Sequence, residues 1–144
     1  MKTRLSLAEF LPYRLSIASN AVSDRISQAY RARFGLSVPE WRLIAVVAEH
    51  GSATQAALVG ATQMDRMTVS RAATALMQRG LLQRAPAGDR RTLELRLTAE
   101  GLALHAEIAP LALALEEQLL QGFSTDERRQ FLLLLQRIES CAKT

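Results

Sequence analysis

The sequence is poor in cysteine, proline, glycine and aromatic residues, and these shortages exclude whole classes of fold. Its single cysteine, Cys141, can form no intrachain disulfide, so only a disulfide to another chain would give it a redox role. With 7 glycines and 4 prolines it has too few turn residues for an all-β fold. Leucine and alanine dominate the hydrophobic residues instead, which favours helices.

Long hydrophobic runs are also absent. No stretch of about 18 uncharged apolar residues predicts a membrane-spanning helix. The N-terminal segment is not followed by the apolar stretch of a signal peptide. We therefore expect a cytoplasmic protein that does not contact the membrane.

Lysine is nearly absent, whereas arginine is abundant. Of 18 basic residues, 16 are arginine, and the net charge of +4 with a pI near 10.0 indicates a polyanionic partner. Arginine suits bidentate contacts with phosphate and guanine. A high-GC coding bias would also enrich arginine, so composition alone leaves both explanations open.

Histidine is scarce, and no catalytic pattern is visible. His50 and His105 are the only histidines, so with one cysteine a dedicated zinc site would depend heavily on carboxylates. There is no glycine-rich phosphate loop and no nucleophile elbow. Glu116 and Glu117 are adjacent and would not face each other on a helix. The sequence thus predicts no metal, no cofactor and no enzyme activity.

At 144 residues the chain is long enough for one domain, or for one domain with a dimerisation extension. Hydrophobic periodicity and capping signals predict a mainly α fold with a minor β part, in the order α-α-α-α-β-β-α-α. The expected helices span about 5–34, 37–50, 54–59, 66–79, 98–121 and 124–142, and the expected strands span 81–85 and 92–97.

Proline, glycine and capping residues set most of these boundaries. Pro12 marks an initial turn or an early kink of the first helix, and Gly35 ends it. Ser37–Glu40 is a capping box for the second helix, and Ser124–Glu127 is one for the last. Pro110 should bend or split the long helix after the strands.

Apolar residues at helical spacing indicate which helix faces are buried. Over 66–79 the expected buried stripe is Val69, Ala72, Ala73 and Leu76. In two other helices the expected core positions are Trp41, Ile44, Ala45 and Ala48, and then Phe131, Leu132, Leu135 and Ile138.

Residues 64–98 combine a helix, a glycine stop and two strands around a turn that contains arginine. They hold seven arginines against three acidic residues, and this surplus equals the net charge of the whole chain, +4. These are the parts of a winged helix-turn-helix, which places one helix in the DNA major groove and a basic hairpin in the minor groove. We therefore predict binding to a double-stranded DNA operator.

The first helix and the last two carry more apolar residues than one helix face needs. A second copy of the chain would cover this surplus, so we expect a homodimer. The expected organisation is a winged helix-turn-helix lobe over 36–98, with 1–35 and 99–144 forming a helical dimerisation region of the same structural unit.

Four segments in order resemble the MarR family of bacterial regulators, and the resemblance runs through nearly the whole chain. It implies dimeric, ligand- or redox-responsive transcription factors, usually repressors, that bind pseudo-palindromic operators. The segments are Leu36-Ser37-x-x-Glu40-Trp41-Arg42, Met64-Asp65-Arg66-x-Thr68-Val69-Ser70-Arg71, Leu76-x-x-x-Gly80-Leu81-Leu82-x-Arg84, and Gly88-Asp89-Arg90-Arg91 followed by Leu97-Thr98-x-x-Gly101.

The resemblance also implies roles for the hairpin. Arg91 is then the wing-tip arginine that enters the minor groove, and Asp89 holds the hairpin by an ion pair. Arg90, next to the tip, is expected to contact phosphate. The competing interpretation is a solvated hairpin tip with a weak surface ion pair.

Other candidate DNA contacts lie near the starts of the two helices of the motif. Free N–H groups at a helix start favour a phosphate, and hydroxyl and guanidinium groups in the first turns reach base edges. The alternatives are ordinary helix surface or, for Arg66, pairing with an acid, whereas Asp65 is expected only to cap its helix. With the hairpin arginines, the candidates are Thr54, Gln55, Arg66, Thr68, Ser70, Arg71, Arg90 and Arg91.

The resemblance further implies a crevice between the dimer helices and the DNA-binding lobe, where family members bind small aromatic or phenolic effectors. The residues that either line this crevice or simply pack are Tyr13, Arg14, Tyr30, Arg42 and His50. Trp41 is expected in the core rather than as a ligand platform.

A winged-helix module that binds another protein is the alternative to a DNA-binding regulator. It predicts a weakly positive wing and a hydrophobic recognition face. The polar Thr68, Ser70 and Arg71 and the charged segment 89–91 argue against it.

Overall fold

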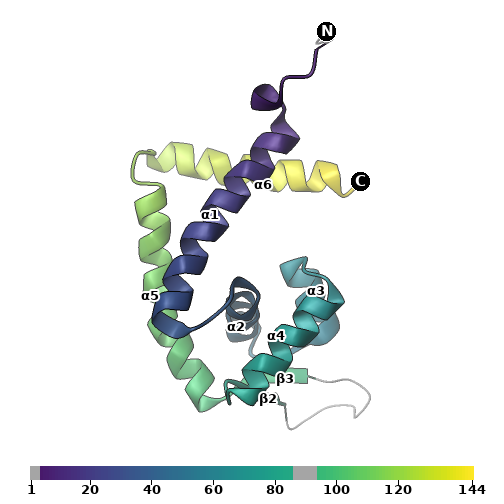
Figure 1. Ribbon diagram of the computed structural model, residues 1–144, viewed down its shortest axis with the longest axis vertical. Helices are drawn as coiled ribbons and strands as arrows, with labels where there is room; N and C mark the ends of the chain where they lie inside the picture. Colours follow the sequence, from purple (N-terminus) through teal and green to yellow (C-terminus); the bar gives the residue numbers. More distant parts are fainter. Residues whose placement is uncertain (1–3, 86–93) are drawn as a thin grey trace. The chain divides into compact units, whose positions relative to one another are not determined.

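The computed structural model describes residues 4–85 and 94–144. The chain divides into two compact units, Met1–Glu107 and Ile108–Thr144. In the described part of the chain, no helix combines the length and the apolar composition that crossing a lipid bilayer requires. The elements, in order, are a 3-10 turn (Leu7–Glu9), α1 (Leu11–Phe34), α2 (Val38–His50), β1 (Ala53–Thr54), α3 (Gln55–Thr62), α4 (Arg66–Gln78), β2 (Leu82–Arg84), β3 (Glu94–Leu97), α5 (Ala99–Leu119) and α6 (Thr125–Ala142) (Figure 1).

The first helix starts later than the sequence predicts. A separate 3-10 turn precedes it, and Pro12 lies in the first turn of α1, where its missing N–H costs no helical hydrogen bond. Gly35 ends α1 as expected, because its left-handed φ of 64° turns the chain and its N–H bonds to the carbonyl oxygen of Arg31 at 3.1 Å.

α2 begins at the predicted capping box. The Ser37 hydroxyl oxygen accepts a hydrogen bond from the N–H of Glu40 at 3.3 Å, and the Glu40 carboxylate accepts one from the N–H of Ser37 at 2.9 Å. These reciprocal bonds satisfy N–H groups that no helical carbonyl reaches. The predicted start is confirmed, and the helix ends at the predicted residue, His50, with Gly51 as its C-cap.

The buried face of α2 differs from the predicted one. Of the predicted set only Ile44 is fully buried, and Trp41, Ala45 and Ala48 are half-buried. Leu43 and Val47 are buried in their place. α2 contacts α1, α3, α4 and the sheet, so several neighbours rather than one stripe decide its burial.

α3 and α4 form the helix-turn-helix. α3 runs beyond its predicted end at Val59 and ends at Thr62. Gln63 then turns the chain as a left-handed C-cap with φ of 59°. α4 starts and ends within one residue of the prediction. Its buried residues are the predicted ones, Val69, Ala72, Ala73 and Leu76.

The sheet contains a third strand that the sequence pattern does not predict. β3 lies in the centre and pairs antiparallel with β1 on one edge and with β2 on the other. β1 has only two residues, too few for an alternating pattern, and exists through its pairing with β3. Leu82, Leu95 and Leu97 are buried on the inner face of the sheet.

α4 is fastened to the start of α5 through Thr98. The Thr98 hydroxyl donates to the carbonyl oxygen of Gly80 at 2.6 Å and accepts the N–H of Gly101 at 3.0 Å, so Thr98 caps α5 at the predicted start of that helix. α5 lies so close to the chain at Leu81 that a Cβ added to Gly101 would collide with the Leu81 carbonyl group. This approach explains the glycine in the Leu97-Thr98-x-x-Gly101 segment.

Three aromatic rings from three helices meet in the first unit. The ring centroids of Tyr30 and Trp41 are 5.2 Å apart, and those of Trp41 and His105 are 6.1 Å apart with nearly parallel planes. Tyr30 is 1% exposed, and burial raises the pKa of its hydroxyl. Trp41 is half-buried and packs between a ring of α1 and a ring of α5.

The second unit contains the end of α5 and all of α6. The sequence predicts that Pro110 bends or splits this helix. α5 continues through it, so the split does not occur, and the helix ends at Leu119 rather than at 121. The Arg128 guanidinium bonds to both carboxylate oxygens of Glu117, at 2.7 and 3.0 Å, and lowers the pKa of that carboxyl. This pair connects α5 to α6.

The apolar residues of α6 are not buried in the described chain. Ser124 and Glu127 form the predicted capping box, so the start of α6 is confirmed. The predicted core positions are wrong for a single chain, because Phe131, Leu132 and Ile138 are exposed and Leu135 is half-buried. The predicted fold class, a mainly α winged helix-turn-helix, is confirmed.

Candidate nucleic-acid interface

α4 presents a polar and basic face opposite its buried stripe. At about 100° of rotation per residue, Arg71 lies near the centre of the opposite face, Ser70 and Thr68 lie toward its two edges, and Arg66 lies at the boundary with the buried stripe. Ser70, Arg71 and Arg66 are exposed, and Thr68 is half-buried. The four predicted recognition-helix residues therefore all reach the solvent-facing side of α4.

Asp65 caps α4 and engages Thr68 twice. One carboxylate oxygen accepts the N–H of Thr68 at 2.8 Å, and the other accepts its hydroxyl proton at 2.9 Å. These bonds, with a smaller attraction from Arg71, lower the pKa of the Asp65 carboxyl. The Thr68 hydroxyl proton is thus committed to the cap, and its oxygen keeps the capacity to accept a bond from a partner.

The start of α3 lies beside the start of α4. The Thr54 hydroxyl oxygen caps α3 by accepting the N–H of Ala57 at 3.1 Å. Gln55 and Arg66 line a groove of about 230 Å³ together with Ala56 and Val59. The structure therefore brings together two predicted DNA contacts, one from each helix of the motif.

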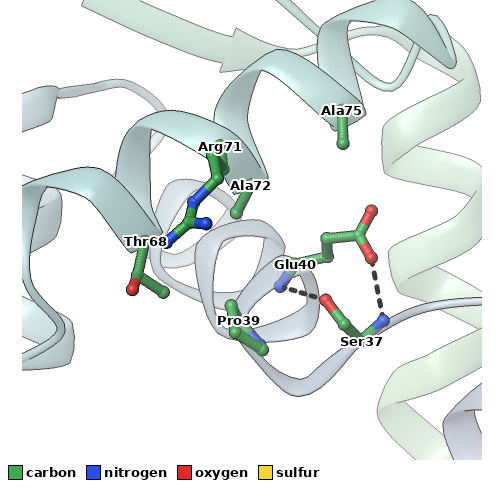
Figure 2. Close-up of a pocket in the computed structure, with 7 residues that line it drawn as sticks. All are labelled: Ser37, Pro39, Glu40, Thr68, Arg71, Ala72 and Ala75. Atoms are coloured by element: carbon green, nitrogen blue, oxygen red, sulfur yellow. Dashed lines mark hydrogen bonds between the residues drawn. The ribbon is translucent and has the colours of Figure 1, made fainter.

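A second groove, of about 320 Å³, lies between α4 and the start of α2. Figure 2 shows the Glu40 carboxylate on the α2 side, held in its capping box, and the Arg71 side chain on the α4 side, extending toward Thr68. In the described residues Arg71 has no hydrogen bond or ion pair to hold it in the groove. The guanidinium is therefore available to a partner that approaches α4. The lining residues are Ser37, Pro39, Glu40, Thr68, Arg71, Ala72 and Ala75.

Arg79 has a different role from the other basic residues of the segment. Its guanidinium donates to the carbonyl oxygens of Phe34 at 3.1 Å and Gly35 at 3.3 Å, at the end of α1. One of the seven arginines of 64–98 therefore bonds within the protein, and it is not among the predicted DNA contacts.

The wing residues Asp89, Arg90 and Arg91 lie outside the described residues, so their roles stay predictions. The strands that lead to them are described. Arg84 on β2 and Arg96 on β3 are exposed, and Arg96 pairs across the strands with Gln83. The described hairpin thus adds two exposed arginines to those of α4.

The structure does not gather the five residues predicted to line an effector crevice. Tyr13 and Tyr30 are 17 residues apart on α1, a separation of about 25 Å at 1.5 Å per residue. Tyr30 is buried in the core, whereas Tyr13, Arg14, Arg42 and His50 are exposed. A crevice that contains Tyr13 and Arg14 stays a prediction, and in one chain it would not include Tyr30.

Sequence reasoning missed Met67 as a member of the solvent-facing side of α4. This side chain is 68% exposed and lies on the same face as Ser70 and Arg71. An apolar contact at this position is the kind that reads the methyl group of thymine. The helical repeat places Met67 far from the buried stripe, and this angle could have assigned it to the solvent-facing side from the sequence. An apolar side chain, however, is ordinarily assigned to the core.

Comparison with known proteins agrees with this geometry. A model of the MarR family matches residues 34–92. The transcriptional regulator PecS of Dickeya dadantii is 28% identical over 130 residues, which are 88% of this chain and 76% of PecS. The fold is similar to that in the crystal structure of a MarR family transcriptional regulator from Silicibacter pomeroyi, with a TM-score of 0.82 and 29% sequence identity. The match covers 96% of this chain and 92% of that chain.

A third similarity concerns the fold. Bordetella bronchiseptica BpsR, whose DNA binding is regulated by 6-hydroxynicotinic acid, has a TM-score of 0.82 at 23% identity over 95% of this chain and 98% of BpsR. The family match covers α2, α3, α4 and β2, the elements that carry the polar face of α4 and its support. Residues 34–92 of this chain thus match the MarR family, and the chain as a whole is similar in sequence and fold to DNA-binding transcriptional regulators.

Proposed function

We propose that this chain is a ligand-responsive repressor that binds a pseudo-palindromic operator as a homodimer. The observation that carries the proposal is the surface of α4, where Arg66, Ser70 and Arg71 are exposed and Arg71 lies opposite the buried stripe. A dimer would present two such helices to half-sites about 10 bp apart. Repression is the usual output that the family resemblance implies.

Exposed apolar surface supports the dimer. In α6, Leu132 is 56% exposed and Leu134 is 53% exposed, and at the start of α1 Leu11 is 70% exposed. Apolar surface of this extent is unusual on a monomer in water. A second copy that covers these helices would remove it from solvent.

The wing extends the proposed contact. By resemblance, Arg91 enters the minor groove, Arg90 contacts phosphate, and Asp89 holds the hairpin. Insertion of arginine is favoured where the minor groove is narrow and its negative potential is high. The exposed Arg84 and Arg96 on the described strands support additional phosphate contacts in this proposal.

The effector that we propose is a small aromatic or phenolic compound. BpsR, which shares the fold, is regulated by 6-hydroxynicotinic acid, and this supports an aromatic class. A thermal-shift screen of phenolic and heteroaromatic acids tests it, because a ligand that binds only the folded dimer raises the melting temperature.

The DNA-binding test uses duplexes selected by the wild-type protein from a random library. We expect two-fold symmetric sequences, and an affinity that falls with salt at a log–log slope of about −0.9 per neutralised phosphate. Arg91→Ala should weaken binding to most sequences and reduce the slope by about 1. Arg71→Ala should instead change which sequence is preferred, and Arg137→Ala on α6 is the control. Unchanged affinity of Arg91→Ala in fluorescence anisotropy would contradict the wing contact.

A further inference from the structure

The end of α4 is bound to two long helices through consecutive residues. Arg79 donates to two carbonyl groups at the end of α1. The carbonyl oxygen of Gly80 accepts the Thr98 hydroxyl at 2.6 Å, and that of Leu81 accepts the Thr98 N–H at 3.1 Å, both at the start of α5. Residues 79–81 therefore form a junction between the helix-turn-helix and the helices α1 and α5.

The α1 side of this junction has chemistry that suits arginine. The last carbonyl groups of a helix have no helical partner and carry the negative end of its dipole. Two guanidinium nitrogens of Arg79 bond to the consecutive carbonyl oxygens of Phe34 and Gly35, a forked contact that lysine cannot reproduce. Gly35 is in a left-handed conformation and Leu36 beside it is fully buried, so the acceptor groups belong to a fixed part of the chain.

We propose that Arg79 is a positioning residue for DNA binding. It fixes the C-terminal end of α4 against the end of α1, and in the dimer it thereby sets the separation of the two recognition helices. This inference rests on the proposed dimeric function. Arg79 acts through α1 and need not touch DNA, so its loss leaves each α4 able to bind one half-site but loosens the spacing between two.

The test compares duplexes with one half-site and with two, taken from the sequences that the wild-type protein selects. The two-half-site series has the natural spacing and spacings one base pair shorter and longer. The variants are Arg79→Gln and Arg79→Lys. Arg33→Gln is the matched control, because Arg33 is an exposed arginine in the last turn of α1 and its replacement removes the same charge.

We expect Arg79→Gln to weaken binding to the naturally spaced duplex by about five- to tenfold, in the range of ordinary coupling between sites. The preference for natural spacing should shrink, while the affinity for one half-site should match that of Arg33→Gln. Arg79→Lys should fall between the wild type and Arg79→Gln, since it keeps the charge but loses the forked contact.

Three results would overturn the inference. The first is equal weakening on one and two half-sites, which would indicate loss of charge or of folded protein, and urea unfolding of each variant separates those two causes. The second is an unchanged spacing preference in Arg79→Gln. The third is that the wild-type protein selects no two-fold symmetric sequence. Of the three results, only this one would also refute the proposed function.

Discussion

The hydroxyl of Thr98 lies 2.6 Å from the carbonyl oxygen of Gly80, so one side chain caps α5 and also holds the turn that ends the recognition helix. The same residue accepts the N–H of Gly101, three positions along α5. The helix-turn-helix and α5 therefore depend on a single threonine at the point where they meet. This dependence leads to the first prediction.

Thr98→Val should destabilise the protein by about 1–2 kcal/mol, because it removes an N-cap and leaves the Gly80 carbonyl oxygen without this donor. Urea unfolding followed by circular dichroism measures the change. Thr74→Val is the matched control, since Thr74 is an exposed threonine of α4, and its replacement should change stability by less than about 0.5 kcal/mol. Equal effects of the two substitutions would refute the role of Thr98.

Gly101→Ala should destabilise the protein even though alanine favours helix. The new Cβ would meet the Leu81 carbonyl group, and overpacking of this kind costs about 1–3 kcal/mol. Gly60→Ala provides the contrast, because Gly60 lies inside α3 with nothing within 4 Å of an added Cβ. It should stabilise the protein by about 0.5–1 kcal/mol. Thermal unfolding should show a lower melting temperature than wild type for Gly101→Ala and a higher one for Gly60→Ala. A shift in the same direction for both variants would contradict the prediction.

Asp65→Asn should change how stability depends on pH. The bonds from Thr68 lower the pKa of the folded Asp65 carboxyl, so its contribution is complete above the unfolded-state pKa of about 4. It is then lost as the pH falls through the lower folded-state value. The advantage of wild type over Asp65→Asn in urea unfolding should therefore be constant near neutral pH and shrink in acid.

Thr68→Val tests the cause of this effect. It removes the hydroxyl bond to Asp65 but keeps the bond from the Thr68 N–H. In this background the acid-sensitive advantage of aspartate over asparagine at position 65 should be smaller. An advantage that stays the same size down to strongly acidic pH, in either background, would show that the carboxylate charge does not matter to the cap.

Leu132→Glu should dissociate the proposed dimer. Leu132 on α6 is 56% exposed, and a charge placed there would be buried in an interface between two copies. Leu102→Glu on α5 is a close control, because Leu102 is 57% exposed. Analytical ultracentrifugation should find Leu132→Glu monomeric at concentrations where the wild type and Leu102→Glu are dimeric. A dimeric Leu132→Glu would place the interface elsewhere.

Local signals in the sequence predict much of this fold. The Ser37–Glu40 box, the Asp65 cap and the Gly35 stop depend on residues three or four positions apart, and the structure contains all three. β1 was not predictable, because two residues become a strand only through pairing with β3, some 40 positions later. A similar distance in sequence hides the partners of Arg79, which is one of the seven arginines of 64–98 but binds the end of α1.

The candidate site also contains residues that local sequence signals predict and residues that they do not. The solvent-facing positions of α4 follow from its helical repeat, so Ser70 and Arg71 could be selected from the sequence. The same repeat places Met67 on this side, but the residue type argues against selecting it, because an apolar side chain is ordinarily assigned to the core. The crevice residues came from resemblance alone, and the length of α1 separates Tyr13 from Tyr30.

Trp41 is the only tryptophan in the chain, and its indole touches a ring from α1 and a ring from α5. Its fluorescence is therefore an intrinsic reporter of how these three helices pack, free of interference from any other indole. Stopped-flow mixing with duplex or with a candidate compound can follow that signal in the unlabelled, unmutated protein, and so measure whether and how fast each of them alters this packing.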